Sequence, residues 1–226
     1  MSDRRKEPLV AVPAGPVSLE GVLELPGGAF GVVVFSHGSG SGRHSPRNRF
    51  VAGALHEARI GTLLLDLLTV QEDQVYENRF DIDRLTERLD HAVAFVRAEA
   101  RTRALAVGLF GASTGAASAL RVAARRPDDI RAVVSRGGRP DLTGARALAQ
   151  VRAPTLLIVG GRDHGVIELN ESARDALTHC ERELAIVPGA THLFEEAGAL
   201  DQVAGLAAKW FARHLAPPAP RNEREE

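Results

Sequence analysis

The sequence has one cysteine, almost no lysine, few aromatic residues and no long apolar run. Cys180 is the only cysteine in 226 residues, which excludes an internal disulfide and is typical of a reducing compartment. No run approaches the roughly 20 apolar residues that span a bilayer. The charged start, MSDRRKEP, is unlike a signal peptide. These absences predict a soluble, cytoplasmic protein with no membrane partner.

Neither sign of charge is in excess. The 28 basic and 29 acidic residues leave a formal net charge of −1, which argues against nucleic acid as the main partner. Lys6 and Lys209 are the only lysines, so all other basic residues are arginines. Genome base composition can produce this bias, so an arginine-rich loop is weaker evidence of function here than elsewhere. The eight histidines show no metal-ligand spacing, and no metal site is predicted.

Short apolar runs alternate with helical patterns along the chain. Segments 81–98 and 200–215 carry apolar stripes at helical spacing, and Ser45-Pro46 is typical of a helix start. Segment 17–25 alternates like an antiparallel strand at a sheet edge. The pattern predicts an α/β fold, a doubly wound, mostly parallel sheet with helices on both faces. Continuous apolar runs, typical of strands buried on both faces, lie at 31–36, 61–66, 105–110, 130–135, 154–160 and 183–188.

The chain is expected to form one domain with a short tail. A hydrophobic content of 44% suits one substantial core, and no internal repeat is present, so residues 1–215 are predicted as a single domain. The segment 216–226, APPAPRNEREE, is proline-rich and then charged, which predicts disorder. The short connection between the runs 130–135 and 154–160 leaves no room for a large lid.

One hydroxyl stands among very small residues in LFGASTGAAS, residues 109–118. Gly111 to Gly115 form a G-x-S-x-G pattern around Ser113, between a predicted strand and a predicted helix over 116–125. In that setting a strained turn exposes the serine as a nucleophile, and the glycines let neighbouring backbone approach. Serine is also a common N-cap of a helix, so this loop leaves both interpretations open.

Two further loops supply the partners that a nucleophilic serine needs. A base must take the hydroxyl proton, and a carboxylate must hold that base in the correct tautomer. Asp163 follows the run 154–160 and His192 follows the run 183–188. The order Ser113, Asp163, His192 is the one that serine hydrolases of this architecture use, so we predict a catalytic triad. Asp141, after the run 130–135, is the alternative acid.

The loop SHGSGSG, residues 36–42, follows the first buried run. Acyl transfer needs N–H donors for the developing oxyanion, one of them from the residue after the nucleophile and one from this early loop. We predict Thr114 and Ser39 as these donors. The glycines could also cradle a phosphate, but the stretch fits neither G-x-G-x-x-G nor the P-loop pattern. Asp66, at the end of the next run, is expected to anchor a loop.

Arginines gather in the loops expected near the catalytic face. Guanidinium groups bind carboxylates bidentately, so one or two of them could hold an anionic group of a small substrate. Arg43 and His44 directly follow the oxyanion glycines and are predicted as substrate-binding residues. Solvated surface arginines remain the alternative. Further arginines in these loops are Arg47, Arg136, Arg139 and Arg162.

These motifs together resemble the α/β-hydrolase superfamily, and within it the dienelactone-hydrolase-like, small serine carboxylesterase-like branch. The resemblance rests on FSHGSGSGRHSPRN, LLLDLLT, GASTGAASAL, VGGRD and PGATHLFEE, and spans roughly residues 17 to 214. It implies no cofactor. By residue, it implies Ser113 as nucleophile, Asp163 as acid, His192 as base, and Ser39 and Thr114 as oxyanion donors.

One departure from that family changes the expected substrate. Dienelactone hydrolases use cysteine as the nucleophile, whereas this chain has Ser113 at that position. We therefore expect a carboxylesterase-like enzyme that cleaves a small-molecule ester, thioester or lactone through an acyl-enzyme on Ser113. A peptidase or acyltransferase with the same triad, and a ligand-binding protein that lacks catalysis, are the alternatives. The oligomeric state is left open.

Overall fold

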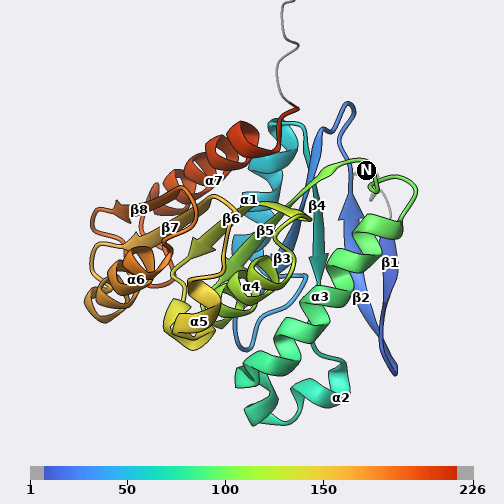
Figure 1. Cartoon of the computed structure of the whole chain (residues 1–226), viewed down its shortest axis with the longest axis horizontal. Helices are drawn as coiled ribbons and strands as arrows, with labels where there is room; N and C mark the ends of the chain where they lie inside the picture. The colour runs from blue at the N-terminus through green and yellow to red at the C-terminus, as the bar shows by residue number, and fades with distance from the viewer. Residues whose placement is uncertain (1–7, 218–226) are drawn as a thin grey trace, which may run out of the picture.

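The computed structural model describes residues 8–217, and these form an eight-stranded sheet with helices on both faces (Figure 1). The strand order is β1-β2-β4-β3-β5-β6-β7-β8. Strands β3 to β8 pair in parallel, whereas β1 and β2 run antiparallel to their neighbours. The predicted doubly wound, mostly parallel α/β fold is confirmed. The strands are β1 (Leu9–Ala14), β2 (Val17–Glu24), β3 (Gly31–Ser36), β4 (Ile60–Leu65), β5 (Ala106–Ala112), β6 (Ile130–Arg136), β7 (Thr155–Gly160) and β8 (Arg182–Val187).

The helices cover the two faces of the sheet. Helices α1 (Pro46–Glu57) and α7 (Ala199–Leu215) pack on one face, and α3 (Ile82–Ala98) and α4 (Thr114–Arg125) pack on the other. Each face encloses its own buried apolar cluster, as continuous apolar strands require. The remaining helical segments are α2 (Val70–Asp73), η1 (Tyr76–Phe80), η2 (Pro140–Thr143), α5 (Ala145–Leu148) and α6 (His164–Ala176).

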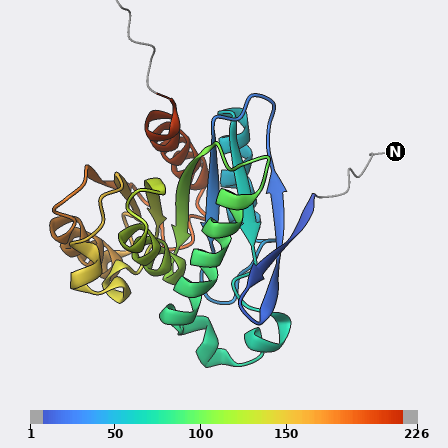
Figure 2. The ribbon, with the colours of Figure 1, turned by 45° about the vertical axis from the view of Figure 1, so that its right-hand side comes forward.

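The antiparallel edge of the sheet differs from the expectation. Segment 17–25 does form an antiparallel strand, β2, but β1 lies outside it and forms the edge (Figure 2). Strand β1 contains Pro13, which lacks an N–H and is tolerated best at an edge. Leu9 is 65% exposed and only Val12 and Ala14 of this strand are buried, although every residue of LVAVPA is apolar, so no alternation in the sequence marks the buried positions. The sequence signal for β1 was therefore weak.

The strand order brings two loops together at one point of the sheet. From β3 the chain passes through α1 to β4 on one side, whereas β5 lies on the other side of β3. Ligands of doubly wound sheets bind where the order reverses in this way, beyond the carboxyl ends of the strands. The loop after β3 and the Ser113 loop after β5 both leave from this point.

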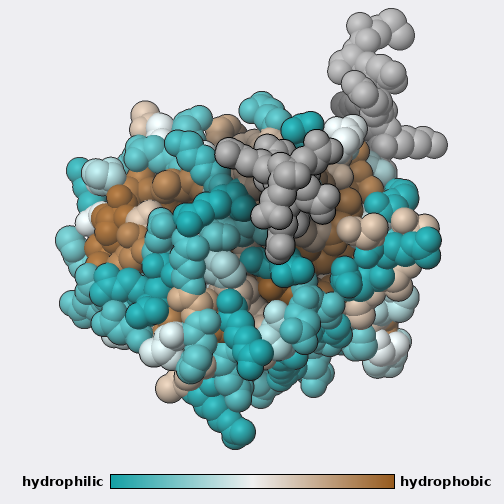
Figure 3. Space-filling view, turned by 45° about the horizontal axis from the view of Figure 1, so that its top comes forward, coloured by the Kyte–Doolittle hydropathy of each residue, from teal (hydrophilic) through white to brown (hydrophobic). Residues whose placement is uncertain are grey.

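Several further expectations concern the connections and the surface. Only η2 and α5 lie between β6 and β7, in agreement with the expectation of little or no lid. None of the helices in residues 8–217 is both long and apolar enough to cross a bilayer. Of the tail predicted to be disordered, residues 218–226 lie outside the described residues. Figure 3, with the amino ends of the parallel strands turned forward, shows a largely hydrophilic face broken by separate apolar areas.

Candidate active site

Ser113 lies on a strained turn between β5 and α4. Its backbone has φ +50° and ψ −122°, a conformation that costs an L-residue free energy and is found at functional sites. The turn is held from two sides. The Ser113 N–H donates to the Arg136 carbonyl at 3.1 Å, and the Ser113 carbonyl accepts from the Arg139 N–H at 3.0 Å. The end of β6 therefore fixes the position of this serine.

The small residues around Ser113 are required by close backbone contacts. A Cβ on Gly115 would lie 2.2 Å from the Ser36 carbonyl oxygen, and one on Gly111 would lie 2.5 Å from the Ala116 Cα. A Cβ on Gly38 would lie 3.0 Å from the Ser113 Cβ. Helix α4 thus approaches the ends of β3 and β5 too closely for any side chain at these positions.

The Ser113 hydroxyl does not cap the helix that it precedes. Serine caps a helix by accepting a hydrogen bond from a backbone N–H in the first turn. Ser113 stands at the N-cap position of α4, yet its side chain makes no such bond. The N-cap interpretation of the sequence is wrong at this position. The half-buried hydroxyl is free of the helix and is available for chemistry.

Asp163 and His192 form the second part of the site. The His192 Nδ1 and the Asp163 Oδ2 are 2.6 Å apart, joined by a hydrogen bond. The Asp163 side chain is 18% exposed and the His192 side chain 39% exposed, so the pair opens to solvent on the histidine side. Asp141, the alternative partner, instead accepts two hydrogen bonds from Arg139 at 2.8 and 2.7 Å. Of the two candidate carboxylates, the structure pairs Asp163 with the imidazole.

Backbone contacts hold the two loops of this pair together. The Arg162 N–H donates to the Ala190 carbonyl at 2.9 Å. A Cβ on Gly160 would lie 2.4 Å from that same carbonyl, so only glycine permits the contact. The fully buried Phe194, with φ +55°, anchors the loop just beyond His192. The histidine is therefore mounted on a loop with little freedom to move.

The segment after β6 lies between Ser113 and His192. Arg136 accepts the Ser113 N–H, as described above, and the next residue, Gly137, lies beside the histidine ring. A Cβ on Gly137 would be 3.5 Å from the His192 Cε1 and 3.2 Å from the His192 carbonyl oxygen. Three loops that are remote in sequence therefore meet at one end of the sheet.

The two predicted oxyanion donors, Ser39 and Thr114, are in contact, and the Ser39 N–H already has a hydrogen-bond partner. The Ser39 N–H donates to the Thr114 Oγ1 at 3.1 Å. Thr114 is the first residue of α4 and is buried, so its own N–H lies at the positive end of that helix. Because its oxygen accepts from Ser39, the Thr114 hydroxyl proton is directed to another acceptor. No local pattern in the sequence indicates this side-chain contact.

His37 is a structural residue of the site that the sequence analysis did not single out. Its Nδ1 is 2.9 Å from the Gly38 carbonyl, and its Nε2 accepts the Leu67 N–H at 2.9 Å. These contacts fix a neutral imidazole with its proton on Nδ1. Burial lowers the pKa of His37, consistent with that neutral form. The imidazole ring links the loop after β3 to the end of β4. The position of His37 directly before the glycine-rich turn is the sequence feature that could have indicated this role.

The structure does not leave Arg43 free for a substrate. Its guanidinium forms ion pairs with Asp66 and with Glu20, and its backbone N–H donates to the Asp66 Oδ1 at 2.7 Å. Asp66 thus anchors the loop, as expected. These contacts argue against the prediction that Arg43 binds substrate, because two carboxylates already neutralise its charge. His44 is exposed.

A cleft lies beside the loop of residues 36–42, at the carboxyl ends of β3 and β4. Its volume is about 340 Å³, and its lining includes His37, Ser41, Leu68 and Arg79. A larger hollow of about 750 Å³, lined by Phe30 and Leu215 among others, lies at the opposite end of the sheet. Within residues 8–217, no three or more His, Cys, Asp or Glu side chains are arranged to hold a metal ion.

Relatives of this chain were found by sequence. The model of the Dienelactone hydrolase family matches residues 69–215. A protein of Mycobacterium tuberculosis strain H37Rv, named "Putative phosphoribosyl transferase Rv0571c", is 54% identical over 211 residues. The match covers 93% of this chain and 47% of that protein. The chain therefore spans about half the length of the curated relatives it matches, and their counterpart in strain CDC 1551 matches equally well.

Solved structures give the same assignment. A dienelactone hydrolase from Anabaena variabilis is 51% identical, with a TM-score of 0.90, and the match covers 93% of this chain and 99% of that one. Est1E from Butyrivibrio proteoclasticus has a TM-score of 0.78 at 15% identity, covering 92% and 99% of the two chains, and supports the fold alone. The chain belongs to the dienelactone hydrolase family and has the α/β-hydrolase fold.

Proposed function

We propose that this protein is a serine hydrolase that cleaves a small carboxylic ester, thioester or lactone through an acyl-enzyme on Ser113. The observation that carries the proposal is the strained turn that presents the Ser113 hydroxyl without a capping bond. The hydrogen-bonded pair of Asp163 and His192 at the same end of the sheet supports it. The Anabaena dienelactone hydrolase, which this chain matches over nearly its whole length, is named for hydrolysis of a lactone and supports the same type of activity.

In the acylation step, the Ser113 oxygen attacks the substrate carbonyl and its proton passes to the His192 Nε2. Asp163 accepts from the Nδ1–H, which holds the imidazole in the correct tautomer and stabilises the imidazolium that forms. His192 then donates the proton to the leaving alcohol or thiol. In the second half, His192 takes a proton from the water that attacks the acyl carbonyl, and it then donates this proton to the Ser113 oxygen as the acyl–oxygen bond breaks and the carboxylic acid leaves.

The oxyanion of each tetrahedral intermediate would lie against the first turn of α4. The Thr114 N–H points into this region from a helix of twelve residues, whose dipole favours negative charge. The Ser39 N–H becomes the second donor when the Thr114 Oγ1 moves aside. Alternatively, the Thr114 hydroxyl itself donates to the oxyanion while its oxygen keeps the Ser39 bond. In both cases Thr114 and Ser39 act together.

The substrate is proposed to be small. Between β6 and β7 the chain offers only the four-residue segments η2 and α5 to cover a substrate. A long acyl chain would remain exposed to water. Esters with short acyl groups therefore fit the site best.

Covalent labelling provides the direct test. A fluorophosphonate probe should label the wild-type protein at Ser113, and peptide mapping should find the adduct on that residue. The Ser113→Ala variant is the matched control and should remain unlabelled. A panel of p-nitrophenyl esters should then show a fall in kcat/KM as the acyl chain lengthens. Absence of labelling in a folded wild-type protein would favour a ligand-binding protein without catalysis.

Two other activities could use the same residues. A peptidase or an acyltransferase would also form an acyl-enzyme on Ser113, and amide substrates and competing alcohols in the assay would reveal them. The name of the mycobacterial relatives includes phosphoribosyl transfer, but the match covers only 47% of those proteins. We therefore propose hydrolysis for the half that this chain represents.

A further inference from the structure

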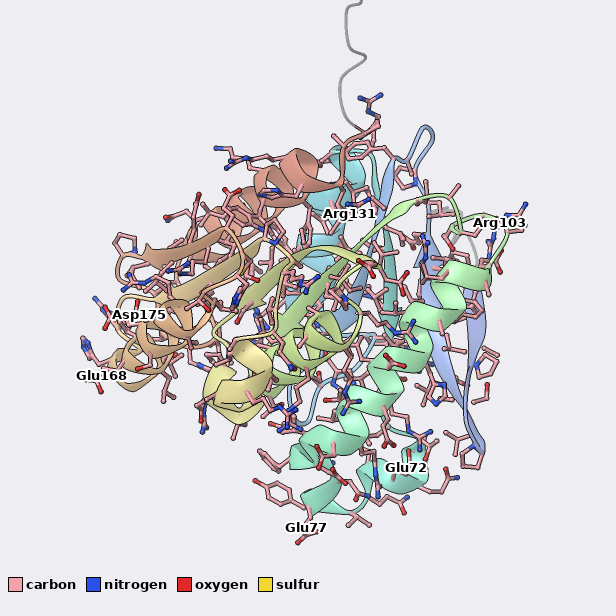
Figure 4. All side chains as sticks on the ribbon, viewed as in Figure 1. Glu72, Glu77, Arg103, Arg131, Glu168 and Asp175 are labelled. Carbon is pink, nitrogen blue, oxygen red and sulfur yellow. The ribbon has the colours of Figure 1, made fainter. Side chains whose placement is uncertain are left out.

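Arg136, the last residue of β6, is a buried cation without a partner for most of its donors. The residue is only 8% exposed, and its Nε and Nη1 make no hydrogen bond. Charged side chains elsewhere usually reach solvent, as Arg103 and Glu168 do in Figure 4. A buried guanidinium without hydrogen bonds costs free energy, so its presence calls for a physical reason.

Arg47 lies close to Arg136. Side chains alternate along a strand, so Arg136 points to the same face as Ala132 and Val134, the face that α1 covers. Arg47 is in the first turn of α1, and its Nε is also buried without a partner. Burial and the nearby charge of Arg47 together lower the pKa of Arg136 to about 10, so Arg136 is still cationic near neutral pH.

These two arginines border the proposed catalytic residues. The Arg136 carbonyl accepts the Ser113 N–H at 3.1 Å, and the following Gly137 lies beside the His192 ring. Arg47 reaches the histidine loop from the other side, where its Nη1 is 3.3 Å from the Glu195 Oε1. That carboxylate is 66% exposed, so solvent screens it and it neutralises little of the paired positive charge.

We propose that Arg136 and Arg47 form a binding site for a phosphate monoester group on the substrate, beside Ser113. The proposal rests on the proposed function in so far as the bound molecule is the one hydrolysed. Two neighbouring arginines need about two negative charges to neutralise them. A phosphate monoester carries −1.5 to −2 at neutral pH, whereas a carboxylate carries −1. Three buried nitrogen atoms without partners would donate to such a group, the Nε and Nη1 of Arg136 and the Nε of Arg47.

Binding can be tested without any turnover. Wild-type protein is titrated with inorganic phosphate, acetate and chloride at constant ionic strength, and the thermal midpoint and the calorimetric Kd are measured. Phosphate should raise the midpoint more than the other two anions. Arg136→Met should weaken phosphate binding by about tenfold or more, since charged hydrogen bonds are lost. Arg139→Met is the matched control, because Asp141 already neutralises that arginine in the same loop.

Stability separates this role from a structural one. Arg136 has no hydrogen bonds through Nε and Nη1 to lose, so Arg136→Met should fold and melt at or above the wild-type midpoint without phosphate. If that variant fails to fold, Arg47→Met, on a more exposed side chain, decides the question by the same titration. Equal binding of acetate and phosphate would overturn the choice of a phosphate group. Unchanged phosphate binding in both folded variants would overturn the site.

Kinetics then connects the site to catalysis. Three esters of equal size, with a neutral, a carboxylate or a phosphate group remote from the reacting carbonyl, are compared in the wild type and in Arg136→Met. The ratio of kcat/KM for the phosphorylated ester to kcat/KM for the neutral ester should fall about tenfold or more in the variant. Ester hydrolysis without a preference for the phosphorylated ester would overturn this inference alone. If the protein binds phosphate but the fluorophosphonate probe never labels Ser113, the proposed function is overturned and the phosphate site at Arg136 and Arg47 still stands.

Discussion

The carboxylate of Asp163 and the imidazole of His192 are 2.6 Å apart, although 29 residues separate them in the chain. The register of two neighbouring strands explains this distance. Gly160 at the end of β7 pairs with Val187 at the end of β8, so both loops leave the sheet at the same level. The Gly161 N–H donates to the Val187 carbonyl at 2.8 Å and continues the pairing beyond the strands.

Replacing each of the two candidate acids by asparagine should show which of them supports catalysis. Asp163→Asn is expected to lower kcat by about 10²- to 10⁴-fold, because the amide favours the wrong imidazole tautomer. Asp141→Asn should leave kcat within about twofold, since that carboxylate is bonded to Arg139. Ester hydrolysis by the two purified variants, with circular dichroism to verify folding, provides the measurement. An equal loss in both variants would contradict the assignment of Asp163.

The strain at Ser113 predicts opposite effects on stability and activity. Ser113→Gly relieves a backbone of φ +50°, ψ −122° and should raise the free energy of unfolding by about 1 kcal/mol. Ser113→Ala keeps the strain, so its stability should stay near the wild type. Both variants should lose several orders of magnitude in turnover, because the nucleophile is absent. Urea unfolding of the three proteins checks the difference, and a glycine variant less stable than the alanine variant would refute it.

Close approach of α4 to β3 makes Gly115 sensitive to any side chain. Gly115→Ala places a methyl group 2.2 Å from the Ser36 carbonyl oxygen and should destabilise the protein by more than about 2 kcal/mol. Gly205, within α7, has no atom within 4 Å of an added Cβ and is the matched control. Gly205→Ala should stabilise by up to about 1 kcal/mol through helix propensity. Thermal denaturation of both variants gives the comparison.

The buried His37 predicts a loss of stability in mild acid. Burial lowers its pKa in the folded state, whereas the unfolded chain protonates a histidine near pH 6.5. The unfolded state therefore binds more protons below about pH 6.5, and stability falls as the pH drops toward the lowered pKa. Each such histidine adds a slope of at most about 1.4 kcal/mol per pH unit.

His56 and His214 have pKa values lowered by burial as well and add to this slope in the same direction. His37→Gln should therefore reduce the pH dependence of the unfolding free energy between pH 7.5 and 5.5 without abolishing it. His44→Gln, on an exposed side chain, serves as the control. Urea titrations at several pH values give the slopes, and an unchanged slope in His37→Gln would contradict the prediction.

Arg43 should affect stability and not the charge preference for substrates. Arg43→Ala breaks the ion pairs with Asp66 and Glu20 and is expected to cost about 1–2 kcal/mol of unfolding free energy. The ratio of kcat/KM for neutral and anionic esters should remain at the wild-type value. A double-mutant cycle with Asp66→Asn measures the coupling. A selective loss for the anionic ester would restore Arg43 as a substrate-binding residue.

The sequence by itself predicted the parallel sheet and the three loops that carry Ser113, Asp163 and His192. Strands buried on both faces have continuous apolar runs, which can be read directly from the sequence. Functional residues of such sheets lie in the loops that follow the carboxyl ends of the strands, so the candidate loops can be read in the same way. The edge strand β1 was not predicted, because Pro13 interrupts its apolar run and its exposed positions are apolar as well. Without an alternation of polar and apolar residues, the sequence does not show which positions of this strand face the core.

Tertiary structure decided which charged groups pair with which. Sequence alone placed Arg43, Arg47 and Arg136 in loops near the site and favoured Arg43 for substrate binding, because Arg43 directly follows the glycines of the loop 36–42. In the fold, Arg43 forms ion pairs with two carboxylates, whereas the Nε and Nη1 of Arg136 are buried without hydrogen-bond partners. The contact between Ser39 and Thr114, 75 residues apart, was equally invisible. The reach of a long side chain and the partner it finds depend on strand register and on helix position, which no local pattern encodes.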